Sequence, residues 1–383
     1  MKIAQVITRM DWGGAPDIVR IMCERLQNDT DVKLITGPSE HPSEKTKAFL
    51  EKFKDKTIII PELKREITNP ISDFIALNKL KQIFKEQQFD VVHTNTAKAG
   101  FLGRIAAKQA GVKYVVHTPH GHNFYGYFNP LLTQLIIFLE KTASKYADKI
   151  IALTELEKKD MAKFKVAAEA KIEVVHTGLE LERFSKAEGA DRKRIREMFS
   201  VDPNLYLIGM AGRLEHVKGP EFLLEAAAYI LDERDDVQII FAGEGPLKQK
   251  LIERCKEIKN GDKVIFAGWR EDVPALLSVL DILVLPSLNE AVGNILIEAA
   301  ASSLPAIAAN VGGVSEIIKD GETGLLVEPH NAEAIGAAIL HLIRMEAARE
   351  KLGKTAKEWA RQNFEAGAMY QRVLELYRRG IHV

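Results

Sequence analysis

The sequence has few of the features that mark a secreted, metal-bound or membrane-spanning protein. It contains 2 cysteines in 383 residues. Cys23 and Cys255 lie too far apart for a zinc motif or a disulfide framework, which is typical of a reducing compartment. The opening residues, MKIAQVIT, lack the apolar run of a signal peptide, and the best apolar run, at 131–140, is too short to span a membrane. We therefore expect a cytoplasmic protein, either soluble or bound at the inner face of the cell membrane.

The chain also lacks a net charge, since 53 Lys and Arg residues balance 53 Asp and Glu residues. Its halves differ slightly: residues 1–190 carry 29 basic and 24 acidic side chains, a net charge of 29 − 24 = +5, which leaves −5 for the remainder. A basic first half permits contact with an anionic surface. No basic stripe interleaved with aromatic residues occurs, which argues against a nucleic-acid-binding protein.

Short β-branched runs alternate with helical segments along the whole chain, which predicts parallel sheets built from βαβ units. The expected strands of the first half are KIAQVIT, DVKLIT, TIIIP, DVVHTN, KYVVHT, DKIIALT and KIEVV. Those of the second half are LYLIGMAGR, VQIIFAGEG, KVIFAG, DILVLPS, PAIAAN and GLLVEP. The length of the chain allows two separate hydrophobic cores.

The alternation restarts after HTGLELERFSK, so the sequence predicts an α/β protein with two doubly wound, Rossmann-like domains. We place the N-terminal domain at 1–187 and the C-terminal domain at 188–365, and expect a last helix at 366–383 to pack back on the first domain. Doubly wound sheets bind ligands at the carboxyl ends of their strands. We therefore expect the two domains to face each other across a cleft.

Two strand-end loops of the first half carry candidate binding residues. Gly13 and Gly14 precede a helix expected to begin at Pro16, and they form either a phosphate-binding turn or a simple tight turn. In HTPHGHNFYGYF, no Cys, Asp or Glu accompanies the histidines, so a zinc site is disfavoured and structural or hydrogen-bonding roles are favoured. The histidines are His117, His120 and His122. The aromatic residues, which suit a contact loop and a core position equally well, are Phe124, Tyr125, Tyr127 and Phe128.

In the second half, GMAGRLEHVKGPEFLLEA ends a strand near Gly212 and starts a helix near Gly219. Arg213 and Lys218 can converge at that helix start. The forked guanidinium of an arginine and the compact ammonium group of a lysine together suit a diphosphate. The alternative for both cations is a solvated charged face.

A second glycine-rich loop, FAGEGPLKQKL, resembles a dinucleotide fingerprint but departs from it. After Gly243 and Gly245, Lys248 occupies the place of the third glycine. A dinucleotide-linked dehydrogenase is therefore disfavoured.

Two glutamates stand in the otherwise apolar segment PSLNEAVGNILIEA. Glu290 follows a strand, and Glu298 falls in the second turn of a helix expected to begin near Gly293 or Asn294. The amides at that helix start can bind a pyrophosphate, and paired carboxylates can accept hydrogen bonds from sugar hydroxyls. The alternative is a helix cap or an exposed side chain.

Together these segments resemble the retaining glycosyltransferases of family 4, which have the GT-B fold of two Rossmann-like domains. The resemblance covers almost the whole chain. Its most specific part is the E-x7-E signature from Glu290 to Glu298, followed by VGGVSEIIKDGETGLLVEP. Weaker matches are the GGA loop at 13–15, the Arg213 and Lys218 pair, and the linker-like HTGLELERF.

The resemblance implies roles for these residues. Arg213 and Lys218 would neutralise the donor diphosphate. Glu298 would bind the nucleotide ribose, and Glu290 would hold hydroxyls of the donor sugar. His120 matches the family's active-site histidine. The donor-binding residues implied are Gly14, Gly212, Arg213, Lys218, Gly243, Glu290, Gly293, Asn294, Ile295, Leu296 and Glu298.

The family works without a metal ion, so the resemblance implies no cofactor and a catalysis that is electrostatic. Two departures concern the donor pocket. Ala291 and Val292 stand where Gly-Phe is common, which narrows the space beside the sugar, and Pro16 replaces a common Glu after GGA.

A looser resemblance joins HTPHGHNFYGYF to enzymes that build bacterial capsule, exopolysaccharide or O-antigen repeats on lipid carriers. It implies a nucleotide-sugar donor, a UDP-sugar above all, and a glycan or lipid-linked acceptor. Residues 131–140 fit peripheral membrane contact and a buried crossover helix equally well.

Two other functions compete with transfer. A sugar-nucleotide epimerase of the same fold would need acid and base carboxylates in the first domain, where no acidic cluster occurs. A sugar-nucleotide-binding subunit without transfer activity is disfavoured because both glutamates, both cations and His120 are present.

Overall fold

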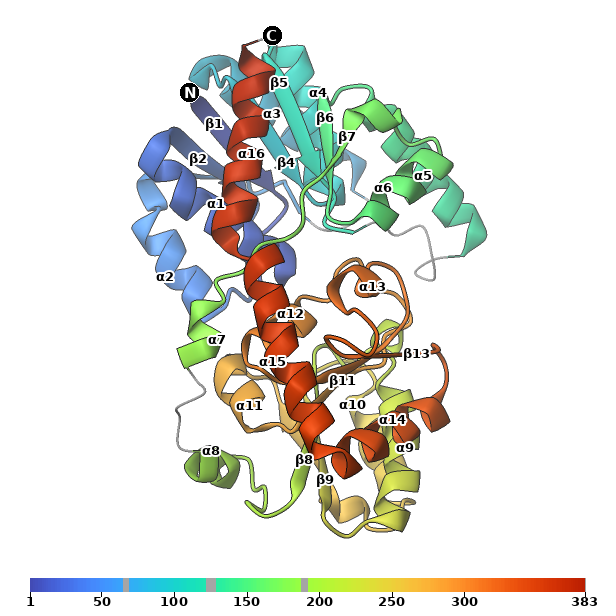
Figure 1. Cartoon of the computed structure of the whole chain (residues 1–383). Helices are drawn as coiled ribbons and strands as arrows, with labels where there is room; N and C mark the ends of the chain where they lie inside the picture. Colours follow the sequence, from blue (N-terminus) through green and yellow to red (C-terminus); the bar gives the residue numbers. More distant parts are fainter. Residues whose placement is uncertain (65–68, 122–128, 187–191, 383) are drawn as a thin grey trace. The chain divides into compact units, whose positions relative to one another are not determined.

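The computed structural model describes residues 1–64, 69–121, 129–186 and 192–382. They form two compact units, one made of Met1–Gly178 with Ala366–Val383 and the other of Leu179–Glu365. Each unit is built around its own parallel sheet (Figure 1). The expectation of two doubly wound, Rossmann-like sheets is therefore confirmed. The second unit already begins at Leu179, so residues 179–186, which the sequence placed in the first domain, belong to the second.

The first unit has a seven-stranded sheet in the order β3-β2-β1-β4-β5-β6-β7. All neighbouring strands are parallel. Nearly all residues of the central strands are buried, which is typical of strands that helices cover on both faces. The strands are β1 (Lys2–Ile7), β2 (Asp31–Thr36), β3 (Thr57–Ile59), β4 (Val91–Asn95), β5 (Tyr114–Thr118), β6 (Lys149–Ala152) and β7 (Ile172–Val174).

The helices of this unit begin where the sequence supplies caps. The side chains of Ser43, Asn69 and Thr154 each accept a hydrogen bond from a backbone N–H of the following turn. Phe84 of α3 and Leu102 of α4 pack together in one buried cluster against the sheet. The helices are α1 (Gly14–Asp29), α2 (Glu44–Lys52), α3 (Pro70–Gln87), α4 (Ala97–Ala110), α5 (Pro130–Ser144) and α6 (Glu155–Lys163), with short 3-10 turns η1 (Lys54–Lys56) and η2 (Glu169–Lys171).

The last helix, α16 (Ala366–Ile381), also belongs to the first unit. It lies beside α1 and against β5 (Figure 1). Tyr370 donates a hydrogen bond to the Asp29 carboxylate at the end of α1, and the side chain of Tyr377 is fully buried. The first unit is thus completed by a segment that follows the second unit in sequence.

The second unit has a six-stranded parallel sheet in the order β10-β9-β8-β11-β12-β13. Helices α9 (Pro220–Glu233) and α14 (Ala332–Arg344) pack on each other, and Leu223 and Ile339 lie in the same core cluster as Ile208 and Phe241 of the sheet. The strands are β8 (Tyr206–Ala211), β9 (Val237–Ala242), β10 (Val264–Gly268), β11 (Ile282–Leu285), β12 (Ala306–Ala309) and β13 (Leu325–Val327).

The chain enters this unit through α7, which packs against α11 and α12. The helices of the unit are α7 (Glu182–Lys186), α8 (Arg192–Met198), α9 (Pro220–Glu233), α10 (Lys248–Cys255), α11 (Val273–Val279), α12 (Asn294–Ala301), α13 (Val314–Ile317), α14 (Ala332–Arg344) and α15 (Glu346–Asn363), with 3-10 turns η4 (His216–Lys218) and η5 (Gly261–Lys263).

Both sheets reverse their strand order once. In the first unit, β2 is added on one side of the adjacent strands β1 and β4, and β5 on the other. In the second unit, β9 and β12 flank the adjacent strands β8 and β11 in the same way. In open α/β sheets, the loops after such a pair diverge and leave a crevice in which ligands bind. The loops after β8 and β11, and those after β1 and β4, are therefore the candidate ligand-binding positions of this fold.

Candidate active site

The loops after β8 and β11 are held against each other. The backbone N–H of Leu288 donates to the carbonyl of Val217 over 2.8 Å. Gly219 caps α9 with a φ of 62°, and a Cβ there would lie 2.1 Å from the carbonyl oxygen of Pro286. Only glycine fits this approach, so the sequence brings the two loops of the switch point into direct contact.

An ion pair bridges the same loops. The Nζ of Lys218 lies 2.5 Å from Oε1 of Glu290, and the hydroxyl of Ser287 donates to the same oxygen over 2.8 Å. The Glu290 side chain is only 8% exposed and that of Lys218 is 27% exposed. A carboxylate removed from water in this way is retained because it is paired and hydrogen-bonded. Ser287 was not expected from the sequence.

The loop after β12 fixes the backbone of Glu290. The N–H of Gly313 donates to the Glu290 carbonyl over 3.1 Å. Gly312 has a φ of 52°, and a Cβ at this position would lie 1.9 Å from the same carbonyl oxygen. The two glycines of VGGVSE therefore allow the loop after β12 to pack directly against the backbone of Glu290.

The N-terminus of α12 follows immediately. The helix begins at Asn294, as expected, and Gly293 caps it with a φ of 78° and no side chain. Leu296 donates its N–H to the Gly293 carbonyl over 2.8 Å. The first N–H groups of a helix have no partner within it and carry partial positive charge. Those of Asn294 and Ile295 therefore suit an anion beside Lys218.

Glu298 lies on α12, one further turn along, and pairs with a different cation. Its Oε1 lies 3.6 Å from the guanidinium of Arg183 on α7, which also stacks over the ring of Phe184. Each glutamate of the E-x7-E signature thus has its own basic partner. Arg183 lies in the linker-like HTGLELERF, and no local spacing in the sequence points to its pairing with Glu298.

The two cations of the β8 loop have separate partners. Arg213 pairs with Glu215 at 3.0 Å and is half exposed, whereas Lys218 pairs with Glu290. Their convergence on one diphosphate stays a prediction, because it requires both to share or release these carboxylates.

Gly243 has a packing reason to be glycine, whereas a Cβ on Gly212 would meet no atom within 4 Å. A Cβ on Gly243 would lie 1.8 Å from the carbonyl oxygen of Gly212. The N–H of Gly212 donates to the carbonyl of Ala242 over 2.9 Å. The loops after β8 and β9 therefore touch through their backbones, and a donor-binding role for Gly243 stays a prediction.

In the first unit, α1 begins at Gly14, with Gly13 as its cap, and not at Pro16 as expected. Pro16 still falls in the first turn, where its missing N–H costs no hydrogen bond. A Cβ on Gly13 would meet only Pro16, at 3.6 Å. The backbone at this strand end is therefore uncrowded.

His120 follows β5, and its Nε2 lies 2.8 Å from Oδ1 of Asn95 at the end of β4. It has a φ of 59°, in the left-handed region that few non-glycine residues adopt. Burial lowers the pKa of His120 to about 4, so the ring is neutral at pH 7. His117 lies within the sheet and hydrogen-bonds to Thr94.

Several expectations for this region are not decided. His122 and the aromatic residues at 124–128 lie outside the described residues. Within the described ranges, His, Cys, Asp and Glu side chains nowhere gather in a group of three that could hold a metal ion. None of the described helices combines the length and apolar character that a membrane crossing needs.

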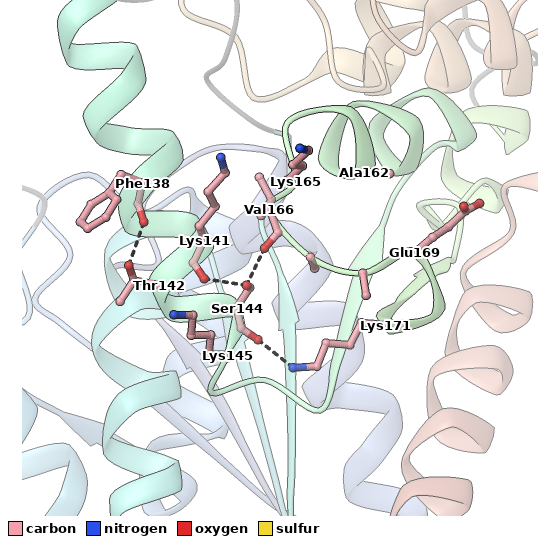
Figure 2. A pocket seen from close by; sticks show the side chains of 12 residues that line it. Phe138, Lys141, Thr142, Ser144, Lys145, Ala162, Lys165, Val166, Glu169 and Lys171 are labelled. Atoms are coloured by element: carbon pink, nitrogen blue, oxygen red, sulfur yellow. Dashed lines mark hydrogen bonds between the residues drawn. The ribbon is translucent and has the colours of Figure 1, made fainter.

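A surface hollow of about 840 Å³ lies away from the strand ends, between α5, the end of α6 and η2. Figure 2 shows the lysines that surround it, Lys141, Lys145, Lys165 and Lys171. Lys171 donates to the backbone carbonyl of Ser144 over 2.9 Å. The hollow is therefore a basic surface feature and not part of the switch-point sites.

Comparison with known families gives two matches. The family of group 1 glycosyl transferases matches residues 191–359, and glycosyltransferase family 4 matches residues 12–183. The first match contains the Lys218 and Glu290 pair, and the second contains His120.

Two relatives illustrate the similarity. One is the Escherichia coli UDP-Gal:alpha-D-GlcNAc-diphosphoundecaprenol alpha-1,3-galactosyltransferase, with 32% identity over 75% of this chain and 74% of that protein. Another is the D-inositol 3-phosphate glycosyltransferase of Salinispora tropica, with 28% identity over 82% of this chain and 69% of that protein.

Solved structures show the same fold over nearly the whole chain. Anabaena Alr3699/HepE, in complex with UDP and glucose, has a TM-score of 0.83 and 20% identity, covering 99% of this chain and 100% of that one. Sucrose-phosphate synthase from Thermosynechococcus elongatus has a TM-score of 0.81 and 21% identity, covering 99% and 98%. These likenesses support the GT-B fold.

Proposed function

Since the chain belongs to glycosyltransferase family 4, we propose that it moves a hexosyl or N-acetylhexosaminyl group from a UDP-sugar to a lipid-linked glycan, with retention of configuration and without a metal ion. The observation that carries the proposal is the position of Lys218. Its ammonium group contacts Glu290, and Glu290 lies on the loop that leads directly into the N-terminus of α12. A cation beside a helix N-terminus is suited to a diphosphate.

The chemistry follows from charge development. As the bond between sugar and diphosphate breaks, negative charge grows on the leaving phosphate. Lys218 and the amides of Asn294 and Ile295 stabilise that charge from fixed positions. Arg213 adds a second cation when it leaves Glu215. In this scheme the charges come from the protein itself, and the leaving phosphate helps to deprotonate the acceptor on the same face of the sugar.

The carboxylates position the donor. Glu290, whose Oε1 already accepts hydrogen bonds from Lys218 and Ser287, accepts further hydrogen bonds from hydroxyls of the transferred sugar. Glu298, on the same helix as the phosphate-binding amides, binds the ribose. Ala291 limits the space beside the sugar and thereby the donors that fit.

Uridine as the base and a lipid-linked acceptor are supported by the relatives. The Escherichia coli relative uses UDP-Gal and a diphosphoundecaprenol-linked acceptor, as its name states. The Anabaena structure contains UDP and glucose. We extend both features to this chain as part of the proposal.

A thermal-shift screen tests the donor. A ligand that binds only the native protein raises the melting temperature with its concentration and affinity. We expect UDP to raise it more than GDP or ADP do, and one UDP-sugar to raise it further. No shift with any nucleotide would contradict the proposed pocket. Binding without transfer to any lipid-linked acceptor, or epimerisation of the bound donor, would instead support the two competing functions.

We further propose that α5 places the protein on an anionic membrane surface, where a lipid-linked acceptor resides. Leu131, Leu135 and Phe138 are spaced by about one turn and are 83%, 51% and 63% exposed. The same helix buries Ile137 in the core of the unit, so it is a crossover helix whose second apolar face is exposed in the described part of the chain. The lysines around the neighbouring hollow supply attraction to acidic headgroups (Figure 2).

Vesicle sedimentation tests this contact. We expect binding to vesicles that contain phosphatidylglycerol and little binding to pure phosphatidylcholine. Phe138→Ser should lower the bound fraction about tenfold, because a large apolar side chain no longer enters the interface. The matched control is Phe74→Ser on α3, since Phe74 is 66% exposed but does not line the basic hollow. Equal losses in both variants, or none in either, would count against α5.

A further inference from the structure

A buried polar network lies behind His120. β1, β4 and β5 are neighbours, with Gln5 opposite His93 and Asn95 opposite Thr118. These side chains lie below α16, whose Tyr377 hydroxyl contacts both Gln5 and His93. All are almost completely removed from water. Buried polar groups are costly unless each finds a partner, so the pattern of donors and acceptors within the network is determined.

The contacts of the Asn95 side chain determine the orientation of its amide group. Its Nδ2 donates to Oε1 of Gln5 at 3.0 Å and lies 3.3 Å from the carbonyl oxygen of Val6 and 3.4 Å from that of His93. Backbone carbonyls only accept hydrogen bonds. The nitrogen of the amide must therefore face these three oxygens, and the amide oxygen must face His120.

The remaining bonds agree with that orientation. Because Oε1 of Gln5 accepts from Asn95, its Nε2 donates to the Tyr377 hydroxyl at 2.9 Å. The hydroxyl proton then points to Nδ1 of His93 at 2.5 Å. His93 carries its own proton on Nε2 and donates to Thr118 at 2.7 Å. Each donor of this network therefore faces at least one acceptor, and Nε2 of Gln5 lies a further 3.5 Å from Nδ1 of His93.

The orientation of the Asn95 amide determines which ring nitrogen of His120 carries the proton. Its Nε2 lies 2.8 Å from an oxygen that can only accept, so Nε2 carries the proton. A neutral imidazole has one proton, and Nδ1 is then left as an acceptor. The titratable side chains coupled to His120 are His93 and His117, and burial holds the pKa of both low, so neither adds charge that would change this state.

We propose that Asn95, held by Gln5 and the Val6 and His93 carbonyls, is a positioning residue that fixes His120 as the Nε2–H tautomer, so that Nδ1 accepts a hydrogen bond from a substrate hydroxyl. The substrate part of this inference rests on the proposed function. The tautomer part does not, because it follows from the contacts of the first unit alone. Tyr377 and His93 close the far end of the network and keep the Gln5 amide from turning.

Nitrogen-15 NMR of histidine-labelled full-length protein tests the tautomer without substrate. The His120 signals are identified by their loss in His120→Gln. We expect long-range proton–nitrogen correlations of the Nε2–H form, unchanged from pH 8 to pH 6. An Nδ1–H form, or titration near the ordinary histidine pKa, would overturn the inference even if the enzyme transfers sugar.

Asn95→Asp tests the consequence for activity. A carboxylate facing Nε2 stabilises the imidazolium, so the pKa of His120 should rise. Nδ1 then becomes protonated at higher pH than in the wild type, and kcat/KM should fall about tenfold for each pH unit below the new pKa and recover as the pH rises. Ser144→Ala is the control for destabilisation: it removes a buried hydroxyl at the end of α5 that donates to the carbonyl of Val166 and takes no part in the network around His120, so the pH profile should stay in place. A profile that moves equally in both variants, or in neither, would assign the network a structural role only.

Discussion

Replacing Lys218 with alanine is expected to lower kcat/KM for transfer by about 10²–10³-fold, the effect of removing one preorganised group that stabilises charge in a transition state. The ammonium group of Lys218 contacts Glu290 on the loop that leads into α12, so the amides at the start of α12 remain in the variant without this cation. The effect should fall mainly on kcat, because the charge on the leaving diphosphate grows during the reaction. Initial rates with a UDP-sugar donor measure it, and the UDP-induced thermal shift should shrink in parallel.

Lys263→Ala is a matched control for this loss of charge. Lys263 is 21% exposed, close to the exposure of Lys218, and pairs with Asp235, which unlike Glu290 is on the surface. It lies just before β10, at the amino edge of the same sheet, far from the strand ends that bind ligands. Its replacement should leave kcat/KM within about twofold of the wild type, in the range of remote surface changes. If both lysine variants retained full activity, the assignment of the diphosphate site to Lys218 would be wrong.

The arrangement of strands could be predicted from the sequence because parallel sheets produce a local signal. Each of the β-branched runs forms a strand, and both sheets have the strand order of doubly wound folds. The start of α12 was predictable for the same reason, since Gly293 marks the change from strand end to helix. The start of α1 was misplaced at Pro16, because Gly14 already adopts helical geometry and proline is accepted anywhere in a first turn.

The partners of the site residues could not be predicted, since they come from distant parts of the chain. Glu290 and Glu298 looked like a pair because they lie on one segment, yet they bind Lys218 and Arg183 respectively. Gln5 is a single polar residue in an apolar strand, and nothing near it in sequence indicates that it supports Asn95. Such contacts depend on strand register and on helices that return from far away.

Gly312→Ala is expected to reduce both stability and transfer, because the new methyl group would lie 1.9 Å from the Glu290 carbonyl oxygen. The loop must move, and the hydrogen bond from Gly313 to that carbonyl is stretched or lost. A displacement of about 1 Å in a group that orients the substrate costs about 10²-fold in rate, and we expect a loss of that size in kcat/KM. Urea unfolding should show a loss of about 2–3 kcal/mol, since a left-handed alanine costs about 1–2 kcal/mol before any clash.

Gly321→Ala separates the clash from the backbone cost. Gly321 has a φ of 73°, so alanine suffers a similar left-handed penalty, but no atom lies within 4 Å of the added Cβ. This variant should lose about 1–2 kcal/mol and keep its kcat/KM. If Gly312→Ala were only as destabilised as Gly321→Ala and equally active, Glu290 would tolerate a moved backbone, and its close seating by the loop after β12 would not be needed for catalysis. If only Gly312→Ala loses kcat/KM, the loop VGGVSE after β12 is needed to position the carboxylate of Glu290.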